Sequence, residues 1–279
     1  MVSFLVTVLM FSAVLQSVTT ERVNADVPTS WVGQRILMLH GYGAVHHADA
    51  DRATTVVGIN IVMPVAKVEG HRVWVRSTGE DDSGWLDSRD AILLSDATAY
   101  LSSLIDRNPE DWDAYLRRAE ANHALNQRDA ATADYTRAIA LHSSEAFLYL
   151  RRGRHYTTLQ DCQAALRDFE AALPLVPTSE HQDYNLAAEL YSLESGVYAG
   201  CADRAFRDPQ KAIAAARRAV ELDSSRPTLL TILAFAYASA GDFGNAIASQ
   251  KQALNSSRFP PGYRKDGQRQ LEEYERQLR

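Results

Sequence analysis

Residues 146–179 read AFLYLRRGRHYTTLQDCQAALRDFEAALPLVPTS, and this stretch decides the fold of the protein. Its small residues Gly153, Ala165 and Ala172 stand at the eighth, twentieth and twenty-seventh positions, with larger apolar residues at helical spacing between them. Two short antiparallel helices approach closely only where side chains are small, and the larger apolar residues then fill the space around the contact. The stretch therefore predicts a pair of packed helices.

Three further stretches repeat this pattern, beginning at Trp112, Leu193 and Pro227. In this register the small residues of the four stretches are Ala119, Gly153, Gly200 and Ala234 at the eighth position, Ala131, Ala165, Ala212 and Ala246 at the twentieth, and Ala138, Ala172, Ala219 and Ala253 at the twenty-seventh. A fixed period of this kind is typical of a solenoid, in which each helix pair packs on the next. The interval before Leu193 is longer than the others, so the third unit is expected to carry an insertion.

The stretch 146–179, which is the second of the four along the sequence, resembles the tetratricopeptide-repeat (TPR) family. The resemblance rests on residues spaced as the family spaces them, namely Tyr149, Gly153, Tyr156, Ala165, Phe169, Ala172 and Pro177. It implies an all-α TPR solenoid of helix-turn-helix repeats over residues 95–258. The parts of this array are a half repeat at 95–109 and repeats at 112–145, 146–192, 193–226 and 227–258, followed by a C-terminal capping helix at 259–279.

The segment before the repeats, residues 30–94, has a strand pattern. Short β-branched or alternating runs separated by Gly, Asp and Ser predict four or five strands, at Ile36–His40, Val56–Val68, Arg72–Ser77 and Gly84–Leu94. Trp74-Val75-Arg76 followed by Gly84-Trp85-Leu86-Asp87 resembles the bacterial SH3-like family, which implies a small all-β barrel, with an OB-like barrel as the alternative. This domain joined to a TPR array is a combination associated with bacterial exported or envelope-facing proteins.

The N-terminus has the pattern of a signal peptide. Phe4–Leu15 is apolar and uncharged but too short to cross a bilayer, and Val23-Asn24-Ala25 offers a small-residue cleavage site. We therefore expect residues 1–25 to be removed and the protein to be periplasmic or secreted. No Lys or Arg precedes the apolar run, so an uncleaved anchor or a misplaced start codon stays open, and without a signal the protein is cytoplasmic. No other apolar stretch is long enough to span a membrane.

Composition narrows the class of protein. The sequence has 279 residues, of which 46% are hydrophobic and 23% charged, as in ordinary globular domains. Its formal charge of -6 argues against nucleic acid as a partner, because nucleic-acid binders carry a basic face. Cys162 and Cys201 are the only cysteines. Export would permit a disulfide, but both cysteines lie in helical segments and two semi-buried thiols are expected.

No combination of residues predicts catalysis, a metal site or a cofactor. His46, His47, Asp49 and Asp51 cluster in sequence, but they lack a second ligand pair and are expected to form a loop. His155 and Cys162 lack an orienting group, and no Gly-rich phosphate loop is present. The protein is therefore expected to be non-enzymatic.

The TPR resemblance also implies a binding surface. In the family the second, fifth, sixth, ninth, twelfth and thirteenth positions of each first helix line a concave groove. By the register above, the groove residues are Leu116, Arg117, Glu120, His123, Leu150, Arg151, Arg154, Thr157, Tyr198, Arg204 and Phe235. The arginines predict a receptor for a peptide carrying carboxylates, such as an acidic segment or the C-terminus of a polypeptide. The alternative is that they are solvated or paired with Glu120 and other local acids.

These observations favour a scaffold that binds a partner polypeptide in the TPR groove. The alternative is a cell-envelope enzyme subunit, whose SH3-like domain binds a cell-wall polymer or a partner enzyme. A third possibility, a self-associating module, is disfavoured because the charged C-terminal helix suits a solvated cap.

Overall fold

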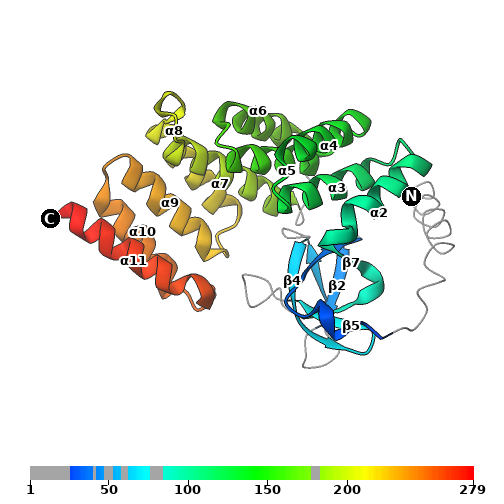
Figure 1. The fold of residues 1–279 in the computed structure, drawn as a ribbon. Helices are drawn as coiled ribbons and strands as arrows, with labels where there is room; N and C mark the ends of the chain where they lie inside the picture. Colours follow the sequence, from blue (N-terminus) through cyan, green and yellow to red (C-terminus); the bar gives the residue numbers. More distant parts are fainter. Residues whose placement is uncertain (1–25, 40–41, 47–52, 58–61, 76–83, 177–182) are drawn as a thin grey trace, which may run out of the picture. The chain divides into compact units, whose positions relative to one another are not determined.

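The computed structural model describes residues 26–39, 42–46, 53–57, 62–75, 84–176 and 183–279 (Figure 1). The protein divides into two compact units, Met1–Tyr100 and Leu101–Arg279, with the division inside helix α2 (Leu94–Arg107). Each unit is described by itself.

The first unit is an antiparallel sheet. Its described residues form seven strands, β1 (Arg35–Met38), β2 (Tyr42–His46), β3 (Ala53–Val57), β4 (Val62–Glu69), β5 (Arg72–Val75), β6 (Gly84–Asp87) and β7 (Ala91–Leu93). They lie in the order β3-β2-β6-β5-β4-β1-β7, and every neighbouring pair is antiparallel. Within the described residues β3 and β7 are therefore free edges, and the sheet is not closed into the predicted barrel.

Buried and half-buried side chains alternate along β5 and β6, so the two strands present two different faces of the sheet. Val73, Val75 and Leu86 are buried and belong to the core of this unit. Trp74 and Trp85 lie opposite each other in register on the other face, half-buried, with their rings edge to face at 5.4 Å. Side chains of one strand alternate between the two faces, which is the period-two pattern on which the strand prediction rested.

The strand prediction was correct for β1 and β5. The predicted strand Gly84–Leu94 is interrupted by the 3-10 helix Ser88–Asp90, which separates β6 from β7. Gly70 has φ +57° in the turn between β4 and β5, as expected for a glycine turn. The predicted strand Val56–Val68 is divided between β3 and β4, and residues 58–61 lie outside the described residues. β2 (Tyr42–His46) was missed, because the cluster that begins at His46 was expected to form a loop.

The second unit is a helical array (Figure 1). With α2, the described residues contain ten α-helices: α3 (Trp112–Ala124), α4 (Arg128–Leu141), α5 (Ala146–Thr158), α6 (Cys162–Ala172), α7 (Asp183–Gly200), α8 (Pro209–Leu222), α9 (Pro227–Ser239), α10 (Phe243–Asn255) and α11 (Pro261–Leu278). Helices α3, α5, α7 and α9 are the first helices of four pairs, and α4, α6, α8 and α10 are the second helices. Helix α11 packs on α10.

Aspartate side chains cap the N-termini of four helices in the array. Asp111, Asp161, Asp208 and Asp242 each accept a hydrogen bond from a backbone N–H two or three residues further on, at the start of α3, α6, α8 and α10 respectively. Such a bond satisfies one of the N–H groups that the first turn of a helix leaves unpaired. These caps fix where the helices begin.

The small residues lie at the helix contacts, as predicted. All eight alanines at the twentieth and twenty-seventh positions are fully buried. At the eighth position Ala119, Gly153 and Ala234 are buried, and each stands five residues before the last residue of its helix. The equivalent residue of α7 is Ser195, which is fully buried, whereas the predicted Gly200 is the last residue of that helix.

The predicted register of the third first helix is therefore wrong by five residues. Helix α7 begins ten residues before Leu193, and residues 201–208 connect it to α8, compared with 125–127, 159–161 and 240–242 in the other pairs. The inserted residues are divided between the start of α7 and this connection. The four second helices keep the predicted register.

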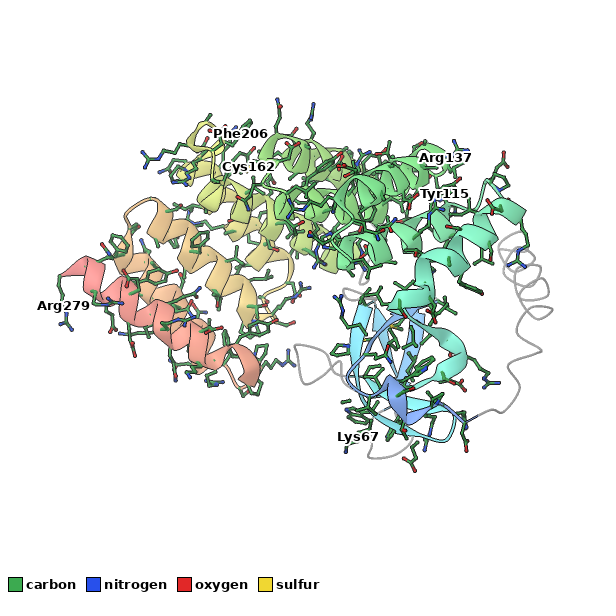
Figure 2. The ribbon with its side chains drawn as sticks, viewed as in Figure 1. Lys67, Tyr115, Arg137, Cys162, Phe206 and Arg279 are labelled. Carbon is green, nitrogen blue, oxygen red and sulfur yellow. A yellow bond between two sulfur atoms is a disulfide. The ribbon has the colours of Figure 1, made fainter. Side chains whose placement is uncertain are left out.

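Cys162 and Cys201 form a disulfide (Figure 2). Cys162 is the first residue of α6 and Cys201 follows the last residue of α7, with their Cα atoms 6.3 Å apart. The expectation of two free thiols is wrong. Its error has the same origin as the register error, because Cys201 reaches α6 only when α7 ends at Gly200.

Two arginines at the seventh position join helices in the first two repeats. Arg152 of α5 pairs with Asp168 of α6 through two hydrogen bonds of 2.8 Å, and its third nitrogen donates to Thr136 of α4. Arg118 makes the same set of bonds one repeat earlier, to Asp134 and Ser102. Each arginine therefore bonds the second helix of its own pair and the helix before it. We call these contacts the arginine staples.

Candidate functional site: the A-helix face

The A-helix face is the surface formed by the second, fifth, sixth, ninth and twelfth positions of α3, α5, α7 and α9. Counting back from the end of α7, its face residues are Glu189, Ser192, Leu193, Gly196 and Ala199. The two residues predicted from this unit are elsewhere. Tyr198 is buried beneath the ammonium group of Lys211, 5.2 Å from its ring, and Arg204 lies in the short 3-10 helix Arg204–Phe206.

Two further predicted residues belong to the core. Leu116 and Leu150, both at the fifth position, are almost completely buried and pack within the helix pairs. They hold the face in place and present little surface to a partner.

Three of the predicted arginines have carboxylate partners within the array. Arg117 donates to Asp113 of the same helix at 2.7 Å. The Arg151 guanidinium lies 3.6 Å from a Glu120 carboxylate oxygen. These pairs match the alternative expectation, in which local acids neutralise the arginines.

The ion pairs continue from one first helix to the next. Glu120 of α3 pairs with Arg151 of α5, and Arg154 of α5 pairs with Glu189 of α7 at 3.3 Å. Arg151 is 4% exposed and its guanidinium carbon lies 4.5 Å from the Phe147 ring centroid. Pairing of three arginines with three carboxylates leaves this part of the face without net charge. An incoming carboxylate would have to compete with an established partner.

His123, another predicted groove residue, is bonded to a buried histidine. Its Nδ1 lies 2.8 Å from Nδ1 of His155, whose Nε2 lies 2.9 Å from the Thr132 hydroxyl. Burial, and then the neighbouring His123, lower the pKa of His155 below its usual range. His155 is 2% exposed and therefore neutral at physiological pH. The hydroxyl of Thr157, also predicted for the groove, donates to the Arg154 carbonyl oxygen of the same helix.

The other end of the face carries no ionisable group among its described residues. It consists of Ser192, Leu193 and Gly196 from α7 and Thr228, Ile232 and Phe235 from α9, and we call it the uncharged patch. Phe235, a predicted groove residue, is 39% exposed. Its ring lies 3.1 Å from the place where a Cβ on Gly200 would stand, whereas a Cβ on Gly196 would meet nothing within 4 Å.

The described residues contain no group of three His, Cys, Asp or Glu side chains that could hold a metal ion. The sequence cluster with His47, Asp49 and Asp51 lies outside them, as do residues 1–25 with the predicted signal peptide. None of the described helices is long and apolar enough to span a membrane.

Comparison with known proteins identifies the repeats. The family model of the tetratricopeptide repeat matches residues 94–146 and 199–263. No curated protein matches this sequence. Solved structures with a similar arrangement include MamA, with 16% identity over 65% of this protein and 92% of that one and a TM-score of 0.49.

Two other similar structures are tetratricopeptide-repeat proteins by their descriptions. TTC0263 from Thermus thermophilus, described as a thermophilic TPR protein, has 20% identity over 66% of this protein and 90% of that one, with a TM-score of 0.48. YrrB, described as a TPR protein with an unusual peptide-binding site, has 21% identity over 64% and 91%, with a TM-score of 0.46.

The family match and the four helix pairs define the second unit as a tetratricopeptide-repeat array. The protein is thus a TPR repeat protein with a small antiparallel sheet at its N-terminal end. The part of the array that the family model leaves unmatched, residues 147–198, includes most of the lengthened α7.

Proposed function

We propose that this protein is a non-enzymatic scaffold that binds a partner polypeptide on the A-helix face. The observation that carries the proposal is the match of the repeats to the TPR model, since TPR proteins generally act through protein partners. The face itself adds support, because it continues over four successive first helices and includes the exposed Phe235.

We propose further that the protein is exported to a periplasmic or extracellular compartment. Disulfides persist in oxidising compartments and are rare in the cytosol. The buried Cys162–Cys201 bond and the apolar N-terminal run Phe4–Leu15 both support export.

For the first unit we propose an SH3-like domain that supplies a second contact. The half-buried pair Trp74 and Trp85, with the Arg72 guanidinium 5.2 Å from the Trp85 ring centroid, supports this role. Amphipathic aromatic side chains beside a cation are frequent in binding surfaces. The alternative function is a cell-envelope enzyme subunit whose SH3-like domain binds a cell-wall polymer or a partner enzyme.

Site-specific photocrosslinking of the full-length protein in its own host tests the scaffold. A photoreactive phenylalanine analogue is placed at Phe235 or Thr157 on the A-helix face, and at the exposed residues Ala133 on α4 and Ala214 on α8 as controls. We expect a discrete adduct with another polypeptide from the face positions and none from the controls. Equal adducts at all four positions, or adducts from the controls alone, would show that the partner does not use this face.

A further inference from the structure

We infer that the partner segment docks on the uncharged patch between α7 and α9, and that this segment is itself uncharged and rich in apolar side chains. The inference rests on the proposed function and specifies the chemistry of the partner. It replaces the carboxylate-bearing peptide that the sequence predicts.

Charge on the A-helix face is the first argument. At the face positions of the described first helices, every arginine already has a carboxylate within 4 Å, and the uncharged patch has no ionisable side chain. A charged segment on the patch would lose hydration without gaining a counterion, which is costly. An uncharged segment has no such cost, so charge complementarity selects it.

Phe235 supplies the second argument. Its ring rests against α7, close to Gly200, while 39% of the residue stays exposed. An aromatic ring that is held in place before binding loses little conformational freedom on binding, and such side chains often carry most of the affinity of an interface. We therefore place an aliphatic or aromatic side chain of the partner on this ring.

Gly196 supplies the third argument. A Cβ at this position would meet no atom within 4 Å, so there is open space directly above the α7 backbone. Ser192 is one turn away on the same side of the helix, and its side chain is also small. A partner can thus approach the α7 backbone closely at Gly196, beside Phe235. The larger side chains of Leu193 and Ile232 prevent such a close approach elsewhere on the patch.

Phage display of random nine-residue peptides on the oxidised full-length protein tests the inference. We expect the selected peptides to be poorer in Asp, Glu, Lys and Arg than the library and richer in aliphatic and aromatic residues. The best peptide is then synthesised with a fluorescent label, and its affinity is measured by anisotropy. Phe235→Ala should weaken binding at least about tenfold.

Three further variants make the test specific. Gly196→Leu fills open space in a helix, so it should keep or raise the melting temperature and still weaken binding about tenfold. Tyr263→Ala removes an aromatic side chain that is 44% exposed on α11, and Arg154→Ala removes a paired arginine. Tyr263→Ala should leave the affinity within about twofold of the parent, whereas Arg154→Ala tests the competing prediction, in which the arginines of the face bind acidic side chains of the partner.

The possible outcomes separate the inference from the proposed function. Acid-rich peptides whose binding is lost in Arg154→Ala would overturn the inference and leave the scaffold function intact. Selected peptides that bind Phe235→Ala and Gly196→Leu as tightly as the parent would also overturn it. If no peptide is enriched over the library, the peptide-binding function is contradicted together with the inference.

Discussion

Gly153 is the residue at which the packing of α5 against α6 allows no side chain. A Cβ built there would lie 2.4 Å from the Phe169 ring, far inside the contact distance of two carbon atoms. We expect Gly153→Leu to destabilise the protein by at least about 1–3 kcal/mol, because Phe169 is fully buried and cannot move aside. Thermal unfolding followed by circular dichroism measures the loss.

Gly244 provides the matched control for this prediction. A Cβ there would meet only the Asp242 carboxylate, at 3.8 Å, so Gly244→Leu should change the melting temperature far less. Equal losses for the two variants would contradict the assigned helix contact. The comparison works because both glycines are in helices and differ mainly in the space around them.

His155 makes stability depend on pH. Its folded pKa is lowered, whereas in the unfolded state it has its ordinary value near 6.5. The unfolded state therefore binds a proton at a higher pH than the folded state, and the free energy of unfolding falls as the pH drops below about 6.5. The charged groups that act on His155 include Glu120 and Arg128, besides His123.

We expect the melting temperature to fall between pH 7.5 and pH 5.5, and to fall less in His155→Gln. Glu194 acts in the opposite sense, because burial and the neighbouring Glu170 raise its pKa and acid then favours the folded state. Glu194 is present in both proteins, so the difference between them reports the histidine. Identical shifts in the parent and the variant would exclude His155 as the cause.

At the scale of helix pairs, the arginine staples join successive elements through buried polar contacts. Asp168 is buried and accepts two hydrogen bonds from Arg152. We expect Asp168→Ala to cost on the order of 3 kcal/mol, because it leaves a mostly buried guanidinium without its partner. Chemical denaturation gives the value.

An exposed ion pair serves as the control for the staple. Glu221 pairs with Arg218 on the surface of α8, where both side chains are more than half exposed. Glu221→Ala should leave stability unchanged within error, since exposed pairs contribute little. If it cost as much as Asp168→Ala, the effect would reflect general charge balance and not the staple.

The third pair has a glutamate in place of the staple arginine and has the disulfide nearby. Its seventh position is Glu194, whose pKa is raised by burial and by Glu170. The Cys162–Cys201 bond closes a loop of 39 residues, for which chain entropy gives about 4 kcal/mol of stabilisation. We expect the double variant Cys162→Ser with Cys201→Ser to lose most of this amount in urea unfolding.

Reductant provides an independent check of the disulfide. Dithiothreitol should lower the unfolding midpoint of the parent to that of the double variant and leave the variant unaffected. A parent whose midpoint is the same with and without reductant would show that the bond does not stabilise the array.

The sequence alone was sufficient to place the helices whose positions depend on local contacts. The second helices could be placed because buried alanines at a fixed spacing determine each one, with an aspartate cap at three of the four, as with Asp161, Ala165 and Ala172. Helix α7 could not be placed from the sequence. The residues inserted in the third repeat can lie before or after this helix without changing the spacing of the neighbouring repeats. Strand β2 is stabilised by pairing with β3 and β6, which its own residues do not reveal.

At the scale of the whole molecule, the sequence predicted which residues of the candidate site lie on the first helices but not which residues they contact. The repeat register correctly placed Arg117, Arg151 and Phe235 on the first helices, because position along a helix follows from periodicity. It could not show that Arg151 and Arg154 pair with acids of neighbouring repeats, since those contacts join residues of different helices. The register also could not place the α7 part of the uncharged patch, because Ser192 and Gly196 reach the face only when α7 ends at Gly200.

Export is a prediction about the whole molecule. If residues 1–25 are a signal, protein made in its own host should begin at Asp26 and contain no free thiol. Mass spectrometry of the purified protein, with and without alkylation, measures both properties. An intact Met1 together with two alkylated cysteines would place the protein in a reducing compartment and contradict export.

The disulfide also limits how far the polypeptide can be drawn out under load. Residues 162 and 201 stay joined however hard the two termini are pulled, so the 39-residue segment between them cannot contribute contour length. A fully extended polypeptide spans about 3.4 Å per residue, which makes the hidden length roughly 130 Å. The protein, pulled from its two ends, is therefore shorter by that amount when oxidised, and the segment with α6 and α7 resists stretching even after the neighbouring helices have unfolded.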